Sequence, residues 1–529
     1  MNYKYVLYSV GKLLQILALV LAAPALIAFF ERSESFGARI THPNLTGFLT
    51  AIAVSLAAGT IAAAAFRKNK GRIDVREGFA IVTFSWLAAA VIGAIPFFAF
   101  FISRGNATPL AAWTDAMFES MSGLTTMGAT VVADVESLPR SIMFWRILTH
   151  WIGGMGIVTL ALALFPAFGV VAYQMFRGET TGPSKERLRP RLAQTAVILW
   201  GVYAFFTLLE TLLLMAGDMP FFDALCHSFS TMATGGFSTR NASVASFDSA
   251  YIEWVIIAFM ILGGTNFFIH YRIIFRNDWK TLKNNREFRL YAAVLVAASA
   301  LCVIFLMTQG LQSQDWAQNN FKYQTMSAED AAARIAVEKE RIAEPGDLIR
   351  RSIFHAVSIV TTTGFAAADW NMWPDFTRTM FFVLMFFGGC AGSTSGGIKM
   401  IRILVLLKVI TNQLRTMVQT RRVHPLKIGG SVLNESQVSS ILTFFVLYIF
   451  LFAAFSAVMA AIIPDFTTAV TSVAAAMGGI GPGLAGVGAF ETYGWIPIHG
   501  KWTLIVCMLL GRLEIYTVLI AFSPASWRK

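Results

Sequence analysis

The chain alternates between long apolar runs and short polar connections. A helix of about 20 apolar residues crosses the hydrocarbon core of a bilayer, and ten runs are close to or above that length. They are residues 5–30, 47–66, 78–103, 141–173, 192–217, 252–275, 289–309, 376–411, 437–463 and 502–522. The run 78–103 contains no charged residue. The pattern predicts an all-α polytopic membrane protein.

Composition supports one membrane-embedded unit. Of the 529 residues, 56% are hydrophobic and 14% are charged, whereas soluble domains carry roughly 25% charged residues. So few charges cannot cover several separate soluble domains, and a disordered or disulfide-stapled chain is excluded. The four cysteines lie in or beside apolar runs without a Cys-x-x-Cys pair, so we expect buried free thiols: Cys226, Cys302, Cys390 and Cys507.

The net charge of +12 comes from basic residues that gather in alternate connections. These connections are residues 67–77, 177–191, 272–289 and 402–427. The connections between them are mixed or acidic, with Asp115, Glu119, Asp134 and Glu136 in one of them. By the positive-inside rule both termini are predicted to be cytoplasmic. The basic excess therefore indicates orientation, and we expect no nucleic-acid partner.

Four short apolar segments repeat along the chain, each ending in a glycine-rich turn. They are residues 118–130, 226–238, 354–366 and 471–483, aligned on Gly128, Gly236, Gly364 and Gly481. Two positions earlier stand Thr126, Thr234, Thr362 and Gly479, and between these positions stand Met127, Gly235, Thr363 and Ile480. The segments are too short to span a bilayer. Each repeat is therefore predicted to be a span, a half-helix, a turn and a second span.

The residue types of these turns suit a monovalent cation. Irregular backbone at membrane depth persists only where it is buried in protein or lines a water-filled path. Glycine tolerates positive φ, so successive carbonyl groups can point the same way and replace the hydration shell of an ion. The carboxyl end of a half-helix adds a negative dipole end. The twelve turn residues named above are thus predicted to form a selectivity filter.

A second set of glycines follows each turn. The pairs Gly153-Gly154, Gly263-Gly264 and Gly388-Gly389 lie at similar distances beyond three of the turns, and the fourth repeat has Gly511-Arg512 instead. A charged residue in mid-span usually faces the bundle interior or a water path. We therefore expect Arg512 to face the permeation path. The alternative is an ion pair with Glu514, although positions i and i+2 do not face each other on a helix.

The run 376–411 is far longer than one span requires, and its middle reads GGCAGSTSGGIK over residues 388–399. So many glycines and small hydroxyl residues hold a helix poorly. We predict an unwound gating loop beneath the filter; the alternative is close helix packing through GxxxG spacing. The predicted gate residues are Gly388, Gly389, Gly392, Ser393, Thr394, Ser395, Gly396, Gly397, Lys399 and Arg512.

These motifs resemble the Trk/Ktr/HKT superfamily of potassium transporters, most closely its bacterial TrkH/TrkG type, over about residues 78–522. The resemblance rests on LTTMGAT, TMATGGFS, VTTTGF, GIGPGL, GGCAGSTSGGIK and GRLEIYT. It implies four membrane–pore-loop–membrane repeats around a central pore, preceded by two transmembrane helices. In that family a glycine in the first pore loop accompanies potassium selectivity and a serine accompanies sodium permeation, and Gly128 matches the potassium type.

The resemblance further implies potassium uptake across a bacterial inner membrane, with K⁺ ions in the filter and no other cofactor held by this chain. It implies a homodimer that binds a cytoplasmic, TrkA-like, nucleotide-binding regulatory subunit. The expected division is 1–70 for the two N-terminal helices, then repeats at 71–176, 177–280, 281–427 and 428–529. The third repeat would carry an extracytoplasmic insertion at 311–350, in which 328–343 is expected to be a well-solvated helix.

Isolated features of the sequence suggest three other functions. K⁺/H⁺ or K⁺/Na⁺ symport along the same path remains open, because Glu210 and Glu514 lie within apolar runs and could relay protons. A membrane-embedded metalloenzyme is less favoured, because His150, His227, His270 and His355 lack metal-ligand spacing. The G-x-G-x-x-G match at 481–486 lies within a filter repeat instead of a βαβ unit, so no nucleotide site is expected in this chain.

Overall fold

The computed structural model describes residues 1–31, 42–67, 75–105, 108–168, 188–311, 328–419, 426–428 and 431–527. Within these residues the regular secondary structure is helical, apart from a short antiparallel ribbon of β1 (Lys427–Ile428) and β2 (Ser431–Val432). The prediction of an all-α membrane protein is confirmed. Parts of the basic connections at 67–77, 177–191 and 402–427 lie outside the described residues.

Among the described residues, six helices are long and apolar enough to cross a membrane. They are α1 (Tyr3–Phe30), α3 (Pro43–Ala65), α4 (Val75–Ser103), α8 (Leu188–Ala216), α13 (Arg286–Gln309) and α19 (Glu435–Ile462). Another predicted span, 141–173, falls on α6 (Arg140–Phe168). These seven helices account for seven of the ten apolar runs.

The other three predicted spans are broken. The expectation of a continuous helix was wrong for 252–275 and 502–522, whereas the unwound stretch within 376–411 was predicted. The helix pair α10 (Ala250–Gly263) and α11 (Phe267–Arg276) bends by 100°, and the pair α21 (Ile498–Arg512) and α22 (Ile515–Phe522) bends by 110°. Helices α17 (Asp375–Leu384) and α18 (Met400–Val418) are separated by an unwound segment. Two of the breaks follow the glycine-containing pair of their repeat, and in the third the pair Gly388-Gly389 lies inside the unwound segment. Helix propensity is low at these glycines.

Four shorter helices of 12 to 16 residues carry the predicted turns at their carboxyl ends. They are α5 (Pro109–Leu124), α9 (Phe221–Met232), α16 (Pro345–Val360) and α20 (Phe466–Gly478). Proline in the first turn starts α5 and α16, where its missing N–H has no intrahelical partner to lose. Because α5 begins at Pro109, Asp115 and Glu119 belong to a half-helix and not to the connection assigned from the sequence.

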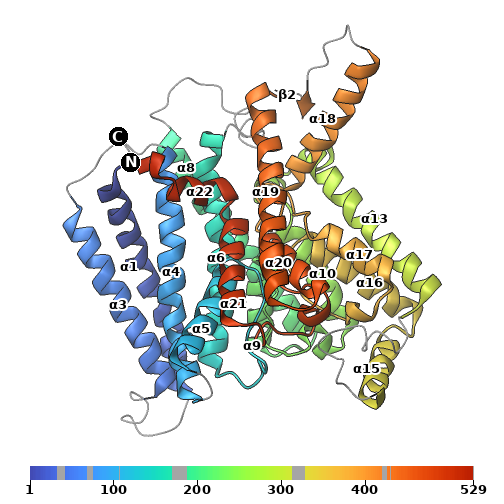
Figure 1. Ribbon diagram of the computed structural model, residues 1–529, viewed down its shortest axis with the longest axis horizontal. Coiled ribbons are helices and arrows are strands. Elements are labelled where there is room, and N and C mark those ends of the chain that lie inside the picture. Colours follow the sequence, from blue (N-terminus) through green and yellow to red (C-terminus); the bar gives the residue numbers. More distant parts are fainter. Residues whose placement is uncertain are drawn as a thin grey trace.

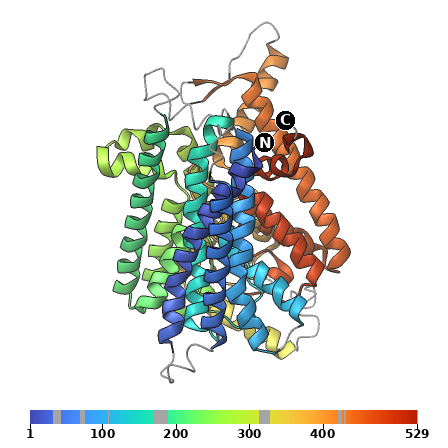
Figure 2. The same ribbon diagram turned by 90° about the vertical axis from the view of Figure 1, so that its left-hand side faces the viewer.

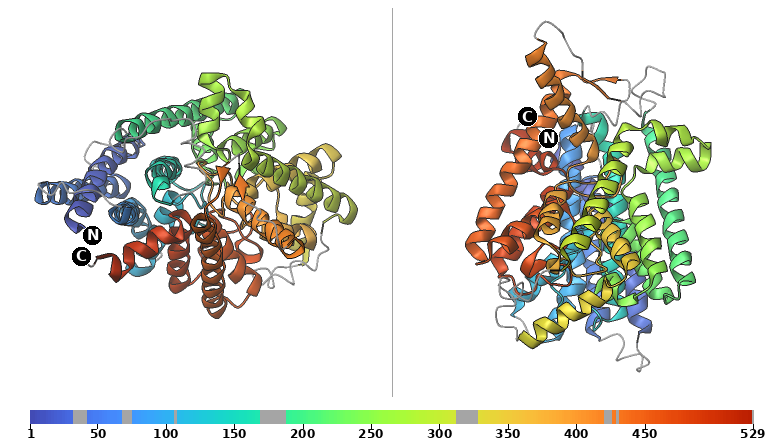
Figure 3. Two further views of the ribbon diagram at one scale, coloured as in Figure 1. Left: turned by 90° about the horizontal axis from the view of Figure 1, so that it is seen from above. Right: turned by 90° about the vertical axis from the view of Figure 1, so that its right-hand side faces the viewer.

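The helices surround a centre in sequence order. Seen from above, α1, α3 and α4 lie on one side, and the chain then continues around the molecule towards α19–α22 (Figure 3, left). Helices α1, α3 and α4 pack together as a separate layer at the edge of the molecule (Figure 2). Both termini lie at the end from which α18 and β2 project, and α15 (Ala328–Arg341) lies at the opposite end (Figure 1).

Helix α15 lies in the predicted insertion at 311–350 and is only partly solvated, and the last residues of that range belong to α16. Ile335 is 5% exposed and Glu338 is 2% exposed, so one face of the helix packs on the protein. Arg334 approaches Glu491 of the fourth repeat at 3.6 Å. The prediction of a well-solvated helix is therefore wrong for this face, because a polar composition does not reveal which side of the helix packs on the protein. The short helices η2 (Ser243–Phe247), α12 (Trp279–Asn284), η4 (Trp370–Met372), η5 (Ala485–Val487) and α23 (Pro524–Trp527) complete the fold.

Candidate functional site

The four half-helices end in the same backbone motif. The N–H of Met127 donates to the carbonyl of Ser122 at 2.9 Å, and the residues Gly235, Thr363 and Ile480 repeat this bond onto Ser230, Ser358 and Ala475 at 2.9, 2.8 and 3.1 Å. Such a bond runs from the residue after a left-handed residue back to the last helical turn, and it is typical of a Schellman ending. Glycine is the usual choice for the left-handed residue.

Three of these left-handed positions are threonines. Thr126, Thr234 and Thr362 have φ of 52°, 51° and 57°, and Gly479 has 68°. A β-branched residue in this region costs on the order of 1–3 kcal/mol. Thr234 Oγ1 lies 3.3 Å from Thr394 Oγ1, and Thr362 Oγ1 accepts from the N–H of Gly396 at 2.7 Å. Two of the three threonines thus contact the 388–399 loop.

The four turns close into a ring, defined here as the glycine ring: residues 126–128, 234–236, 362–364 and 479–481. The glycines Gly128, Gly236, Gly364 and Gly481 have φ of 82°, 81°, 79° and 96°. A Cβ on Gly128 would lie 2.1 Å from the carbonyl oxygen of Gly235. The corresponding distances are 2.1 Å from Gly236 to Thr363, 1.7 Å from Gly364 to Ile480 and 2.6 Å from Gly481 to Met127. Each glycine therefore admits the carbonyl of the next turn, and the fourth turn meets the first.

The glycine ring opens into a cavity on the side of the loops that follow the turns. All four ring glycines line it, together with Arg146, Asn241, Glu491 and neighbouring backbone. All twelve predicted filter residues lie in these four turns. The structure therefore brings together segments from the four quarters of the chain around one opening.

On the opposite side of the ring, the backbone is unwound from Met385 to Lys399. The alternative of a continuous, closely packed helix is excluded. The ends of this segment are joined by bonds from Gly388 N to Ile398 O at 3.0 Å and from Ile398 N to Phe386 O at 3.1 Å. Lys399 donates through Nζ to the carbonyl of Ser395.

The 388–399 loop contacts other repeats through glycine backbone. The N–H of Cys390 donates to Gly264 O at 2.8 Å, and Thr394 Oγ1 lies 2.9 Å from Met232 O and 3.1 Å from Gly263 O. A Cβ on Gly396 would lie 2.3 Å from Gly478 O. The loop therefore lies directly beneath the glycine ring and is held by the second and fourth repeats as well as its own.

Arg512 is 5% exposed and reaches across this space. Its Nη1 donates to Thr394 O at 2.7 Å, and its Nη2 donates to Gly153 O at 3.1 Å. Glu514 pairs instead with Arg402 at 2.6 Å. The alternative pairing of Arg512 with Glu514 is therefore wrong, because the bend after α21 turns the two side chains towards different neighbours.

The sequence profile of the TrkH family, a cation transport protein family, matches residues 45–529. The chain belongs to the TrkH family.

Full-length relatives agree with this assignment. The chain is 36% identical to the Trk system potassium uptake protein TrkH of Salmonella typhimurium over 531 aligned positions, which cover both chains completely. It is 31% identical to TrkG of Escherichia coli, with 99% of each chain covered. The crystal structure of the potassium transporter TrkH from Vibrio parahaemolyticus matches with a TM-score of 0.83 at 32% identity, over all of both chains. The chain is thus a multi-pass membrane transporter, and the enzyme alternative is set aside.

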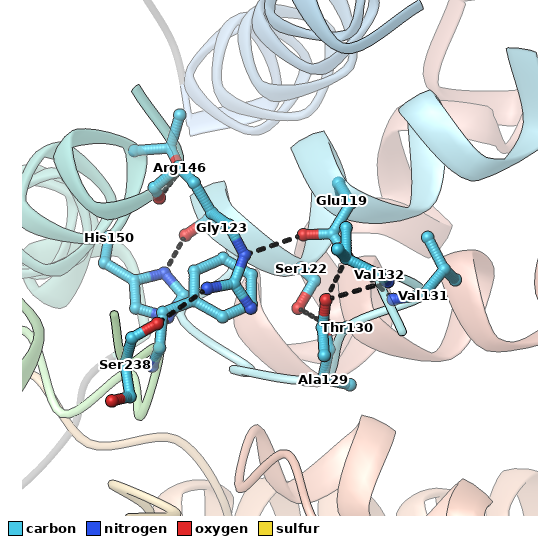
Figure 4. Close-up of polar contacts among 12 residues, drawn as sticks. Glu119, Ser122, Gly123, Ala129, Thr130, Val131, Val132, Arg146, His150 and Ser238 are labelled. Carbon is cyan, nitrogen blue, oxygen red and sulfur yellow. Dashed lines mark hydrogen bonds and ion pairs between the residues drawn. The ribbon is translucent and has the colours of Figure 1, made fainter. Parts of the chain in front are cut away.

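This TrkH-family chain also holds a buried ion pair beside the ring, and sequence reasoning missed it. Glu119 of α5 and Arg146 of α6 meet at 3.0 Å with side-chain exposures of 0% and 2% (Figure 4). Glu119 also accepts from Thr130 Oγ1 at 2.5 Å and from the N–H of Val131 at 2.7 Å. Arg146 donates to Ser238 O at 3.2 Å and covers the ring of Phe237 at 3.4 Å. The pair therefore links the chain just beyond the first turn to the chain just beyond the second.

The four histidines are structural in this geometry. His150 bonds Gly123 O at 2.7 Å, His227 bonds Asp223 O at 2.8 Å, and His270 bonds Leu262 O at 2.9 Å. His355 lies with its ring centroid 4.9 Å from those of Trp370 and Trp373. Within the described residues, no group of three or more His, Cys, Asp or Glu side chains could hold a metal ion.

Loss of one member of the Glu119–Arg146 pair should destabilise the protein strongly. Removing one partner of a buried ion pair leaves an uncompensated charge and costs about 3–5 kcal/mol. Glu119→Gln and Arg146→Met should each lower the melting temperature of the purified protein in detergent, and the double variant Glu119→Leu/Arg146→Met should lower it less. Arg104→Met is the control, because Arg104 is exposed and also covers a ring, that of Phe100 at 4.7 Å. Equal melting temperatures for all variants would contradict a structural role for the pair.

Proposed function

We propose that this chain takes up potassium through the glycine ring and that the 388–399 loop gates the path. The observation that carries the proposal is the closed contact between four equivalent turns, each with two left-handed positions. Alternating backbone conformation lets carbonyl oxygens of successive residues share a direction, and rings of carbonyls replace the water around K⁺. Four half-helix carboxyl ends around the ring favour a cation. Several full-length relatives carry the name of potassium uptake proteins.

The twelve residues of the glycine ring act as the K⁺ ligands in this proposal. The gate consists of the small residues of the 388–399 loop, Lys399 and Arg512, because the loop lies across the space beneath the ring and touches three repeats. The proposed division is two N-terminal helices at 1–70 and repeats at 71–176, 177–280, 281–427 and 428–529. Helices α5, α9, α16 and α20 supply one half-helix to each repeat.

We further propose a setting for this activity: a bacterial inner membrane with both termini cytoplasmic. Both termini lie at one end of the molecule (Figure 1), and this end carries exposed basic residues such as Arg276, Lys280 and Lys283. Basic connections favour the cytoplasmic side. A homodimer bound to a TrkA-like, nucleotide-binding regulatory subunit would supply control from outside the chain, and the name "Trk system" among its relatives accords with a multi-component transporter.

Symport with H⁺ or Na⁺ is the second candidate mechanism, and one observation favours it. Glu210 of α8 is fully buried, and neither carboxyl oxygen has a hydrogen-bond partner among the described residues. A buried carboxyl group within an apolar span is a candidate for a proton relay. Glu514 is a weaker candidate because Arg402 neutralises it. Reversal potentials of proteoliposomes under separate K⁺, Na⁺ and H⁺ gradients distinguish symport from channel-like uptake.

The first test of the filter is Gly128→Ser. The added Cβ would meet the Gly235 carbonyl at 2.1 Å, so the neighbouring ligand must move and K⁺ loses its fitted cage. We expect the K⁺/Na⁺ flux ratio in proteoliposomes to fall by about tenfold or more, equal to about 1.4 kcal/mol. Gly105→Ser is the matched control, because Gly105 also has positive φ, 71°, but no described atom lies within 4 Å of its Cβ position. An unchanged ratio for Gly128→Ser would refute the filter.

The gate is tested by deleting Gly392–Gly396. The deletion removes the part of the loop that contacts Met232, Gly263 and Gly478, so flux of K⁺ and of Rb⁺ should rise severalfold. Selectivity should stay close to that of the parent, because the Schellman bonds of the ring do not involve these residues. Lower flux in a variant with the parental size-exclusion profile and melting temperature would argue against a gate.

Arg512→Ala tests the charge beneath the ring. A cation roughly 8 Å from the guanidinium, at an effective dielectric near 20, is repelled by about 2 kcal/mol, which is roughly a thirtyfold change in rate. We expect higher K⁺ flux with a nearly unchanged K⁺/Na⁺ ratio. Arg512→Lys is the control, because it keeps the charge but cannot hold Thr394 O and Gly153 O together with one planar group. If Arg512→Ala abolishes selectivity, the charge acts on the filter itself and the barrier is disproved.

A further inference from the structure

One buried carboxylate lies at the two ends of the 388–399 loop. Glu287 is in the first turn of α13 and is 4% exposed. Its Oε1 accepts from the N–H of Ala391 at 2.6 Å and from the N–H of Ile401 at 3.1 Å. Ala391 belongs to the loop, and Ile401 to the first turn of α18. One carboxylate oxygen on α13 thus joins the beginning of the loop to α18, the helix that follows the loop.

The surroundings of Glu287 suit a charged latch. Amide hydrogen bonds to a carboxylate are shorter and about twice as strong as neutral ones. The first N–H groups of a helix need outside partners, and in the described structure Lys399, the N-cap of α18, supplies no side-chain bond to them. Glu287 satisfies one of these N–H groups from a different helix. Its own position in the first turn of α13 places its charge at a positive dipole end.

The segment that precedes Glu287 in the chain contacts the 388–399 loop at a second point. The N–H of Phe267 donates to Gly392 O at 3.1 Å, and Asn266 Oδ1 lies 3.1 Å from the Cβ position of Gly392. Between these contacts and Glu287, helices α11 and α12 pack on each other, and Arg272 pairs with Asp278. Residues 266–287 therefore form a connected clamp that touches the loop at Gly392, Ala391 and the start of α18.

The outer side of this clamp is basic and accessible. Arg276, Lys280, Lys283 and Arg286 are exposed, while Glu287 beside them is buried against the loop. A displacement of the exposed side would therefore act directly on the hydrogen bonds that hold the loop.

We propose that Glu287 is a positioning residue that latches the 388–399 loop in its closed position, and that residues 266–287 are the clamp through which the loop is released. The inference rests on the proposed gate and adds the element that holds it. Glu287 does not touch the glycine ring, so its loss should alter flux without altering selectivity.

Cys390 provides a native reporter of the latch. It is 1% exposed, precedes Ala391 and is a free thiol. In full-length protein with Cys226, Cys302 and Cys507 replaced by alanine, maleimide should label Cys390 slowly. Glu287→Ala should raise the labelling rate about tenfold or more, as expected for the loss of hydrogen bonds to a charged group. Glu287→Gln, which keeps the shape and one acceptor oxygen, should give a smaller increase. K⁺ flux in proteoliposomes should rise in the same order, at a constant K⁺/Na⁺ ratio.

Glu77 is the matched control. It lies in the first turn of α4, is 7% exposed and accepts from the N–H of Asn2 at 2.9 Å. It thus resembles Glu287 in position and burial but contacts the amino terminus. Glu77→Ala and Glu77→Gln should leave both Cys390 labelling and K⁺ flux unchanged.

The outcomes separate the latch from the gate. Unchanged Cys390 labelling in both Glu287 variants overturns the latch. Faster labelling with unchanged flux, in a protein whose flux does rise on deletion of Gly392–Gly396, also overturns it, because the gate works without this restraint. If the deletion itself leaves flux unchanged, the proposed gate fails irrespective of Glu287. A loss of the K⁺/Na⁺ ratio in Glu287→Gln would place its effect on the glycine ring and reject a role confined to the loop.

Discussion

The close approach of each ring glycine to the carbonyl of the next turn is the contact on which the rest of the site depends. A side chain at Gly128, Gly236, Gly364 or Gly481 would overlap a neighbouring carbonyl oxygen at 1.7 to 2.6 Å. Four turns from one chain can therefore meet only where Cβ is absent. The half-helices supply the turns at the required angle through their Schellman endings, and the longer helices surround them. A backbone-lined opening is the consequence, and backbone carbonyls are well suited to a dehydrated monovalent cation.

Beneath the ring the four repeats differ in their second helices. Among the second helices of the repeats, α6 passes through its glycine pair, α10 and α21 end at theirs, and α17 ends before Gly388-Gly389. The breaks free backbone groups, and the 388–399 loop uses two of them, because Gly263 and Gly264 accept from it. Arg512, the last residue of α21, joins Gly153 to Thr394. Strained threonines at the ends of two half-helices contact the same loop. The loop is thus tied to the backbone that forms the ring.

Several charged side chains inside this apolar protein form ion pairs. Glu119 with Arg146, Glu253 with Arg350, and Glu514 with Arg402 each approach within 3.0 Å. These pairs join residues far apart in sequence, so they specify how repeats and loops meet. Buried pairs add little net stability but are costly to break. Glu287 follows a different pattern, because its Oε1 accepts from two backbone N–H groups, and one of them belongs to a loop that must be able to move in the proposed mechanism.

The sequence alone determined the helical membrane class and the positions of the four turns. Apolar run length identifies spans, and Thr-x-Gly in three repeats with Gly-x-Gly in the fourth identifies the turns, because both depend on local composition. It also identified the unwound stretch at 388–399, since so many glycines cannot sustain a helix. Only the tertiary structure decided that 252–275 and 502–522 are bent, that Glu119 is buried against Arg146, and that Arg512 turns to Thr394 instead of Glu514. Those outcomes depend on which distant group supplies a partner. Glu287 shows the limit most clearly, because an acidic residue in a first helical turn is ordinary in sequence, and only its two amide partners from a distant loop distinguish it.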